Sequence, residues 1–268
     1  MKLWQIDAFA DKPLEGNPAA VVPLEKFPQD GLLQKIAREN NLAETAYFVK
    51  TGEGRYHLRW FTPEAEVELC GHATLASAHL LFSELEPALT KIRFMTRSGE
   101  LLVIRGGDGQ LVMSLPSDPP SPYASSKNVA AEIGASLGTT APTELHASRY
   151  LLALWDDPAV IRGIKDCGEV ARVLRENKFW GLIVTAPGDA GYDFISRFFA
   201  PDKGVPEDPV TGSAHTILTP FWAKRLGKKT MKARQVSPRG GDLYCTDDGP
   251  RTTITGRCAL YLKGEIFV

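Results

Sequence analysis

One pattern occurs twice in this chain, about half a chain length apart, and it constrains the fold more than any other feature. The first copy begins with Arg59-Trp60-Phe61 and leads to Cys70-Gly71-His72-Ala73-Thr74. The second begins with Arg197-Phe198-Phe199 and leads to Asp208-Pro209-Val210-Thr211-Gly212-Ser213. The two arginines are 138 positions apart, and the motif glycines are 141 apart. The sequence therefore predicts two copies of one folding unit.

Two turn signals keep nearly the same spacing, which strengthens this prediction. They pair Ser98-Gly99 with Gly240-Gly241, and Asp108-Gly109 with Asp248-Gly249. Asp-Gly favours the tight turn of a β-hairpin, so we expect a hairpin at Asp108.

A linker is expected between the copies, where Pro116 to Pro122 contains four prolines in seven residues. We therefore predict an N-terminal lobe at 1–117 and a C-terminal lobe at 118–258. The last strand, at about 259–268, is a candidate to return to the N-terminal lobe. A chain of 268 residues is long enough for two such lobes.

Composition narrows the class of protein. Hydrophobic residues make up 43% of the chain, and the net charge of −1 gives no electrostatic case for binding nucleic acid or an acidic membrane. No run is long and apolar enough to cross a membrane, and Asp7 interrupts any signal-peptide core. The four cysteines lack the spacing of a disulfide scaffold. These features favour a cytoplasmic protein with reduced thiols.

The strand and helix patterns predict an α+β fold. A helix is expected from about Gln29 to Asn40, with a left-handed stop at Asn40-Asn41. A second helix, at 73–82, is apolar nearly all round, so a curved sheet should wrap around it. A third has an apolar stripe from Ala214 to Leu226, in which Pro220 should kink or shorten the helix.

Glu44 is the first candidate for chemistry. It opens a predicted strand on the same side as Ala46 and Phe48, which places a carboxylate on an apolar face. The alternative is a solvated glutamate at a strand end, which residue statistics alone favour.

The two motif helices are the second candidate. A helix N-terminus presents unpaired N–H groups and partial positive charge, so two of them could hold a small anion. The alternative is that Thr74, Thr211 and Ser213 only cap these helices. His72 and His79 share a helical face, but a metal site there lacks a nearby carboxylate pair.

The chain resembles the phenazine-biosynthesis PhzF-like family over essentially its whole length. The resemblance is carried by four segments: Gly16-Asn17-Pro18-Ala19-Ala20-Val21, Asn41-Leu42-Ala43-Glu44-Thr45-Ala46, Leu69 to Thr74, and Glu207 to His215. It implies a diaminopimelate-epimerase-like fold, in which two pseudo-symmetric lobes each wrap a curved, mixed sheet around a central helix. It also implies an active site in the cleft between the lobes and a possible homodimer.

The resemblance also implies roles for individual residues. Glu44 would move a proton between carbon atoms of the substrate without a metal or organic cofactor, with His72 and Asp208 as its polar partners. Gly71, Ala73, Gly212 and Ser213 would hold a small carboxylate-bearing substrate, and Cys70 would be at most an accessory base.

Two departures leave alternatives open. The second motif has no thiol matching Cys70, which argues against a symmetric two-thiol racemase. Many relatives carry serine at the position of Ala43, so the substrate is not fixed. The rivals to a proton-shifting isomerase are an amino-acid epimerase, using Cys70 or Glu44 with Asp208 as a second base, and a non-catalytic protein-binding module.

Overall fold

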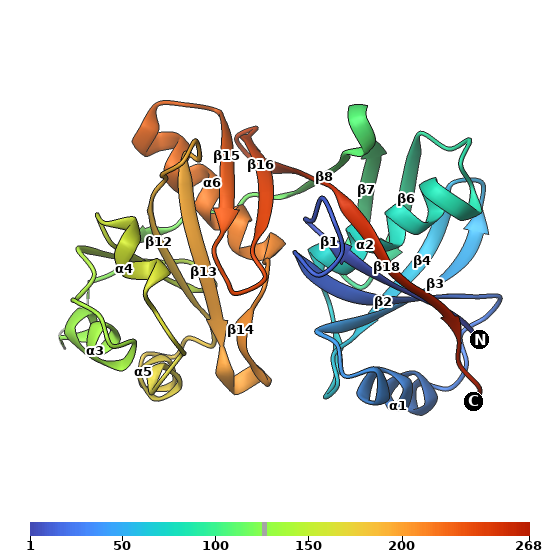
Figure 1. Ribbon diagram of the computed structural model, residues 1–268, viewed down its shortest axis with the longest axis horizontal. Helices are drawn as coiled ribbons and strands as arrows, with labels where there is room; N and C mark the ends of the chain where they lie inside the picture. Colours follow the sequence, from blue (N-terminus) through green and yellow to red (C-terminus); the bar gives the residue numbers. More distant parts are fainter. Residues whose placement is uncertain (125–127) are drawn as a thin grey trace. The chain divides into compact units, whose positions relative to one another are not determined.

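The computed structural model describes residues 1–124 and 128–268, and its chain forms two compact units (Figure 1). Unit 1 contains Met1–Leu115 together with Thr253–Val268, and unit 2 contains Pro116–Thr252. The chain enters unit 2 where the proline-rich stretch begins. Its last strand belongs to unit 1, where it pairs with the first.

The elements before the linker are β1 (Lys2–Ala8), β2 (Asn17–Leu24), α1 (Asp30–Asn40), β3 (Glu44–Gly52), β4 (Arg55–Phe61), β5 (Glu66–Val67), α2 (Gly71–Leu80), the π-helical segment η1 (Leu81–Leu85), β6 (Lys91–Thr96), β7 (Gly99–Arg105), the turn η2 (Gly107–Gly109) and β8 (Leu111–Pro116).

The remaining elements are β9 (Ser121–Pro122), α3 (Val129–Ser136), β10 (Glu144–Ala147), β11 (Leu151–Leu154), α4 (Pro158–Arg162), α5 (Val170–Glu176), β12 (Leu182–Pro187), β13 (Phe194–Ala200), η3 (Pro201–Lys203), β14 (Val205–Asp208), α6 (Gly212–Leu226), β15 (Thr230–Gln235), β16 (Gly241–Asp247), β17 (Arg251–Gly256) and β18 (Cys258–Glu265).

Both units pair their strands in the same order, which confirms the duplication predicted from the sequence. In unit 1, β1–β2 is antiparallel, β2–β3 parallel, β3–β4 and β4–β5 antiparallel, β4–β6 parallel and β6–β7 antiparallel. Unit 2 repeats these relations from β10–β11 to β15–β16. Along the chain, the motif helix of each unit follows the fifth of these strands and precedes the sixth: α2 comes between β5 and β6, and α6 between β14 and β15.

The repeated arginine makes the same contacts in both units. Arg59 forms a two-pronged ion pair with Glu66, at 2.8 and 2.7 Å, and Arg197 forms one with Glu207, at 2.7 Å on both prongs. Each guanidinium also lies over the aromatic ring two residues later, at 5.1 Å in unit 1 and 5.2 Å in unit 2. Each pair ties a long strand to the short return strand that leads into the motif helix.

The helix α2 is buried on nearly every side, as its composition predicts. All of its residues except His79 are buried, and it packs on β1, β2 and β3. The absence of a polar face means that the helix is stable only inside the curled sheet of unit 1.

The helix α6 contains Pro220 but runs unbroken from Gly212 to Leu226, so the predicted shortening is wrong. A proline leaves the carbonyl four residues earlier without its helical donor. Here that carbonyl, of Thr216, accepts a hydrogen bond from the Asp118 N–H at 3.0 Å instead. The apolar stripe ends before Leu226, which is exposed.

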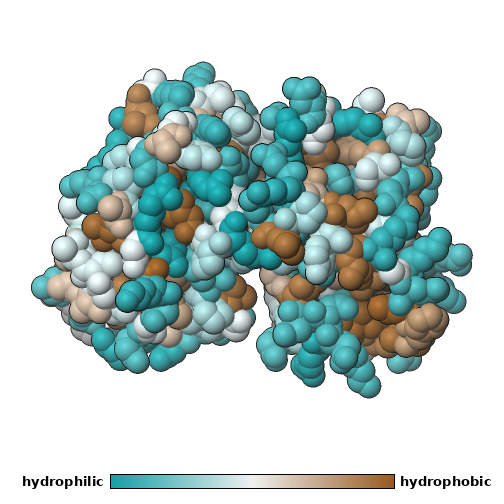
Figure 2. All heavy atoms as spheres, viewed as in Figure 1, coloured by the Kyte–Doolittle hydropathy of each residue, from teal (hydrophilic) through white to brown (hydrophobic). Residues whose placement is uncertain are grey.

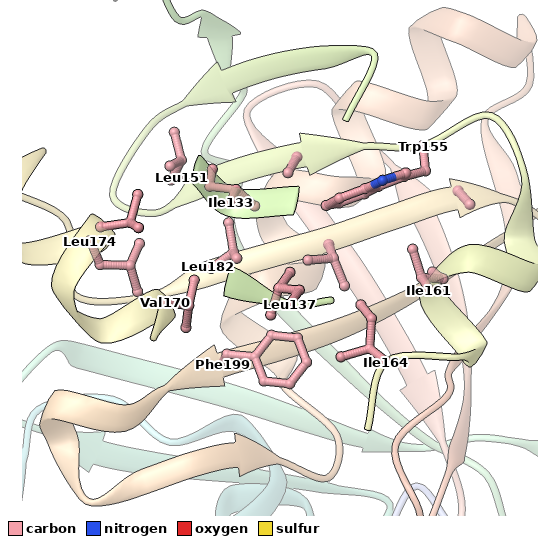
Figure 3. Close-up of a cluster of buried hydrophobic side chains, with 14 of the residues drawn as sticks. Ile133, Leu137, Leu151, Trp155, Ile161, Ile164, Val170, Leu174, Leu182 and Phe199 are labelled. Atoms are coloured by element: carbon pink, nitrogen blue, oxygen red, sulfur yellow. The ribbon is translucent and has the colours of Figure 1, made fainter. Parts of the chain in front are cut away.

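Unit 2 has a hydrophobic core on the sheet side that faces α3, α4 and α5 (Figure 3). Trp155 and Phe199 are its large aromatic members, surrounded by Leu151, Leu182 and Ile133. The corresponding cluster in unit 1 lies under α1 and includes Leu33, Ile36 and Tyr47. The helices α4 and α5, between β11 and β12, thus take the place that α1 has between β2 and β3.

Two local predictions are confirmed. The helix α1 ends at Asn41, which has the left-handed conformation with φ 48°. Asp108 and Gly109 both have positive φ, 54° and 74°, in the hairpin between β7 and β8.

The surface is mixed, with apolar patches among mostly polar side chains (Figure 2). Consecutive exposed apolar residues occur on β18, at Leu260, Tyr261 and Leu262. Within residues 1–124 and 128–268, no helix is both long enough and apolar enough to cross a membrane.

The arginine–glutamate pair in unit 2 generates a test of stability. Arg197 is only 3% exposed and also donates to the carbonyls of Ile161 and Ile164. Arg197→Met should lower the free energy of unfolding by about 3 kcal/mol, because Glu207, whose side chain is only 17% exposed, loses its partner. Denaturant unfolding followed by tryptophan fluorescence measures this change.

The matched control is Arg162→Met, which removes an ion pair to Asp189 whose side chains are more than one-third exposed. It should change the free energy of unfolding by less than about 1 kcal/mol. Similar losses for the two variants would contradict the structural role given to Arg197.

Candidate active site

Four side chains from the sequence motifs meet in unit 1: Asn17, Glu44, Cys70 and His72. Asn17 is the first residue of β2 and Glu44 the first of β3. These strands are parallel, with Glu44 opposite Ala19, so both side chains lie at the same end of the sheet. Cys70 and His72 come from the start of α2.

Glu44 and His72 face each other. The Glu44 Oε2 atom lies 3.1 Å from His72 Nε2, and the two side chains are 17% and 5% exposed. The second ring nitrogen, Nδ1, lies 3.1 Å from the Asn17 amide and 3.5 Å from Cys70 Sγ. The Asn17 atom that faces Nδ1 is the amide nitrogen, a donor, which suits an unprotonated Nδ1. Turning the amide by 180° would present its oxygen to a protonated Nδ1. The imidazole ring is therefore held on both edges.

The loop before β2 fixes Asn17. Gly16 has φ 64°, and a Cβ there would lie 2.1 Å from the Ala8 carbonyl oxygen. Phe9, in the same loop, is buried and also has positive φ, at 59°. A glycine is thus required immediately before Asn17.

Burial and neighbouring charges shift the pKa values of Cys70 and His72. Burial raises the pKa of the Cys70 thiol to about 11, and the Glu44 charge acts in the same direction. Cys70 is therefore a neutral thiol near pH 7. Burial opposes a charge on His72, whereas negative charge on Cys70 or Glu44 beside it raises the pKa of His72 well above its usual value. With the Cys70 thiol neutral near pH 7, Glu44 is the group that acts in this direction. This favours an imidazolium facing the Glu44 carboxylate.

The alternative that threonine and serine side chains only cap the motif helices is wrong. The N-cap residues are Cys70 in α2 and Thr211 in α6, and neither side chain forms a cap hydrogen bond. The Thr74 hydroxyl donates to the Cys70 carbonyl, and the Thr211 hydroxyl donates to Asp208 at 2.5 Å. The first-turn N–H groups of both helices thus keep the capacity to bind an anion.

Unit 2 holds the other predicted residues together around the start of α6. The Gln235 amide joins this segment: its NH₂ donates to the Asp208 carbonyl at 2.6 Å, and its oxygen accepts from the Thr211 N–H at 2.9 Å. Gln235 is fully buried. The Asp208 side chain and the Gly212-Ser213 start of α6 are therefore held as one segment.

Sequence reasoning missed Gln235 and Tyr150, and it gave no role to Asn17. Tyr150 is 3% exposed, and its hydroxyl lies 3.0 Å from Ser213 Oγ. Each of the three is distant in sequence from the residue it contacts. Of the three, only Asn17 lies in a segment by which the sequence resembles the PhzF-like family.

The side chains of Glu44, Cys70 and His72 are also the kinds that bind zinc, and their donor atoms lie within 4.8 Å of one another. In the arrangement observed, however, Nε2 and Oε2 face each other. A metal ion would have to displace the Glu44–His72 contact.

The topology and the paired helix starts define a class of protein, the diaminopimelate-epimerase-like α+β proteins. A crystal structure of a probable proline racemase from Agrobacterium radiobacter has the same fold. It matches with a TM-score of 0.66 over all of this chain and 93% of that one, at 11% identity.

The chain belongs to the phenazine biosynthesis-like (PhzC-PhzF) protein family, whose model matches residues 6–264. It is 45% identical to a Pseudomonas aeruginosa protein named as an uncharacterised isomerase, over 99% of this chain and 98% of that one. A crystal structure of a PhzF-family protein from Enterococcus faecalis matches with a TM-score of 0.91 and 41% identity, over 100% of this chain and 99% of that one.

The state of Cys70 can be tested chemically. At pH 8, about one Cys70 thiol in a thousand is ionised, because its pKa is about 11. Brief treatment of the folded protein with iodoacetamide should therefore leave Cys70 unmodified and label the partly exposed Cys167 first. Peptide mass spectrometry locates the label. Rapid alkylation of Cys70 in the folded protein would show that it is a thiolate.

His215, in the first turn of α6, predicts how the free energy of unfolding depends on pH. Burial lowers its pKa to about 4 from the usual 6.5, while Nδ1 contacts the Thr211 carbonyl at 2.8 Å. Between pH 4 and pH 6.5, His215 therefore carries a proton in the unfolded chain but not in the folded one. Stability should therefore fall by about 3 kcal/mol from this group as pH drops from 6.5 to 4.

His215→Asn keeps a donor near the Thr211 carbonyl but removes the titration. Its free energy of unfolding should depend less steeply on pH across this window, as measured by urea unfolding at several pH values. Equal slopes in wild type and variant would contradict a neutral, buried His215.

Proposed function

We propose that this protein is a cofactor-independent isomerase that moves a proton between carbon atoms of a small, carboxylate-bearing substrate, with Glu44 as acid and base. The observation that carries the proposal is the contact between Glu44 and His72, at 3.1 Å, beside the first turn of a buried helix. A carboxylate placed in this way has a polar partner on one oxygen and little water around it.

The chemistry follows from these surroundings. Removing a proton from carbon requires a positioned base and stabilisation of the negative charge that develops. The His72 imidazolium supplies positive charge beside Glu44, and the N–H groups of Gly71 and Ala73 point from a helix N-terminus. Glu44 then returns the proton to a second carbon, so no other base is needed.

The residues of unit 2 are assigned to holding the substrate. Gly212 and Ser213 begin α6, where uncapped N–H groups favour a carboxylate. Asp208 is assigned as a further polar partner in proton transfer. The buried Gln235 and the Thr211 hydroxyl hold its segment in place.

The state of Cys70 weighs against the form of the amino-acid epimerase that uses this thiol as a base. A base must be able to lose its proton near pH 7, and burial keeps this thiol protonated. The position equivalent to Cys70 in unit 2 is Thr211, whose hydroxyl already donates to Asp208. The name of the Pseudomonas aeruginosa relative, an isomerase, is in keeping with the reaction proposed.

Deuterium incorporation from heavy water tests the proposal. Wild-type protein is incubated with cyclic and aromatic amino-carboxylic acids, including dihydro-hydroxyanthranilate-like acids, and with α-amino acids, and carbon-bound deuterium is followed by NMR. We expect label to enter one compound together with a shifted double bond. Glu44→Gln should lower the rate by at least about a hundredfold, because it removes the acid–base group.

The matched control is Glu64→Gln, which changes an exposed glutamate in the same unit and should leave the rate unchanged. Label that persists in Glu44→Gln but is lost in Cys70→Ala, with inversion at one carbon, would establish the epimerase instead.

A further inference from the structure

The duplication identifies a positioning residue in unit 2. In unit 1, Asn17 at the start of β2 contacts the side chain of His72, the second residue of α2. The strand of unit 2 that corresponds to β2 is β11, and Tyr150 immediately precedes it. The Tyr150 hydroxyl contacts Ser213, the second residue of α6, at 3.0 Å. By strand register Tyr150 corresponds to Ala19, two residues beyond Asn17, so the two contacts are similar but not equivalent. Each joins a residue at the start of the second strand to the second residue of the motif helix.

We propose that Tyr150 donates its hydroxyl proton to Ser213 Oγ, so that the Ser213 hydroxyl proton is directed to a bound ligand and the subsite accepts an ionised carboxylate. This deepens the proposed function, because it rests on the assignment of Ser213 to the substrate carboxylate. Tyr150 acts through Ser213 and does not itself contact the reacting atoms.

The direction of the hydrogen bond follows from the acidity of the two hydroxyls. A phenol is a stronger acid than an aliphatic alcohol, so it is the better donor, and the serine oxygen is the better acceptor. Burial raises the pKa of Tyr150 and outweighs the Ser213 contact and Arg149, which act in the opposite direction, so the phenol keeps its proton near neutral pH. Accepting this bond polarises the serine hydroxyl and strengthens it as a donor.

The Tyr150 ring has little freedom to move. It makes edge contacts with Trp180 and Phe198, both at 4.8 Å between ring centroids. A Cβ on Gly181 would lie 2.7 Å from the Phe198 ring and 3.1 Å from the Tyr150 ring, so only glycine lets the two rings meet. The phenol oxygen is thereby fixed against the start of α6.

The resulting subsite offers hydrogen-bond donors. The Thr211 side chain makes no cap hydrogen bond to the first turn of α6, and Ser213 adds an O–H whose oxygen already contacts Tyr150. An ionised carboxylate accepts hydrogen bonds only, whereas a carboxamide also presents donors. The subsite should therefore prefer a carboxylate to its amide.

The test compares benzoate and benzamide as probes, titrated into wild-type, Tyr150→Phe, Ser213→Ala and the double variant by isothermal calorimetry at pH 7. Wild type should bind benzoate more tightly than benzamide. Tyr150→Phe, which keeps the ring, should weaken benzoate binding about three- to tenfold. The double variant should bind benzoate no more weakly than Ser213→Ala, because Tyr150 acts through Ser213.

The control is Tyr192→Phe, which removes a hydroxyl bonded to Asp242 at 2.9 Å and should leave benzoate binding unchanged. The proposal is overturned if Tyr150→Phe leaves benzoate affinity unchanged, weakens benzamide binding equally, or adds to the effect of Ser213→Ala.

The titrations are repeated in Glu44→Gln, where benzoate binding should persist. A failure of proton transfer is thereby separated from a failure of the Tyr150 assignment. With a turned-over substrate, Tyr150→Phe should raise KM and leave kcat within about twofold.

Discussion

Two arginine–glutamate ion pairs are the interactions on which the rest of each unit depends. Arg59 with Glu66, and Arg197 with Glu207, join a long strand to the short strand that turns back along it. That return strand precedes α2 or α6 by a loop of three residues, so the ion pair anchors the segment that leads into the helix. Arg197 also donates to the carbonyls of Ile161 and Ile164, which connects α4 to the same strand. A planar, permanently charged group suits this place, because it makes several directed hydrogen bonds at once.

The same scaffold carries different chemistry in its two copies. The second residue of the motif helix is His72 in unit 1 and Ser213 in unit 2, and each is held by a residue at the start of a corresponding strand. In unit 1 this arrangement places an imidazole beside the Glu44 carboxyl group. In unit 2 it produces neutral donors at a helix start. Duplication thus supplies two geometrically equivalent positions, and the side chains give them separate roles.

The sequence contained the repeat, the buried α2 and the turn at Asp108, because these depend on local periodicity and on residue types with strong backbone preferences. It did not reveal Tyr150 or Gln235, because a contact between residues 63 or 24 positions apart leaves no local signal. It also misled at Pro220, where the helix continues and the distant Asp118 N–H bonds the Thr216 carbonyl that the proline leaves free. The roles of Glu44, His72 and Asp208, and a homodimer, remain predictions.

The difference between the two motif loops bears on the type of reaction. An epimerase that inverts one carbon with two bases needs one on each face of the substrate. Here Cys70 is a buried, protonated thiol, and Thr211 takes the equivalent place with its hydroxyl bound to Asp208. Neither side chain is suited to removing a proton from carbon near pH 7. The proposed reaction, in which one group removes and returns the proton, rests instead on the contact between Glu44 and His72 at the start of α2.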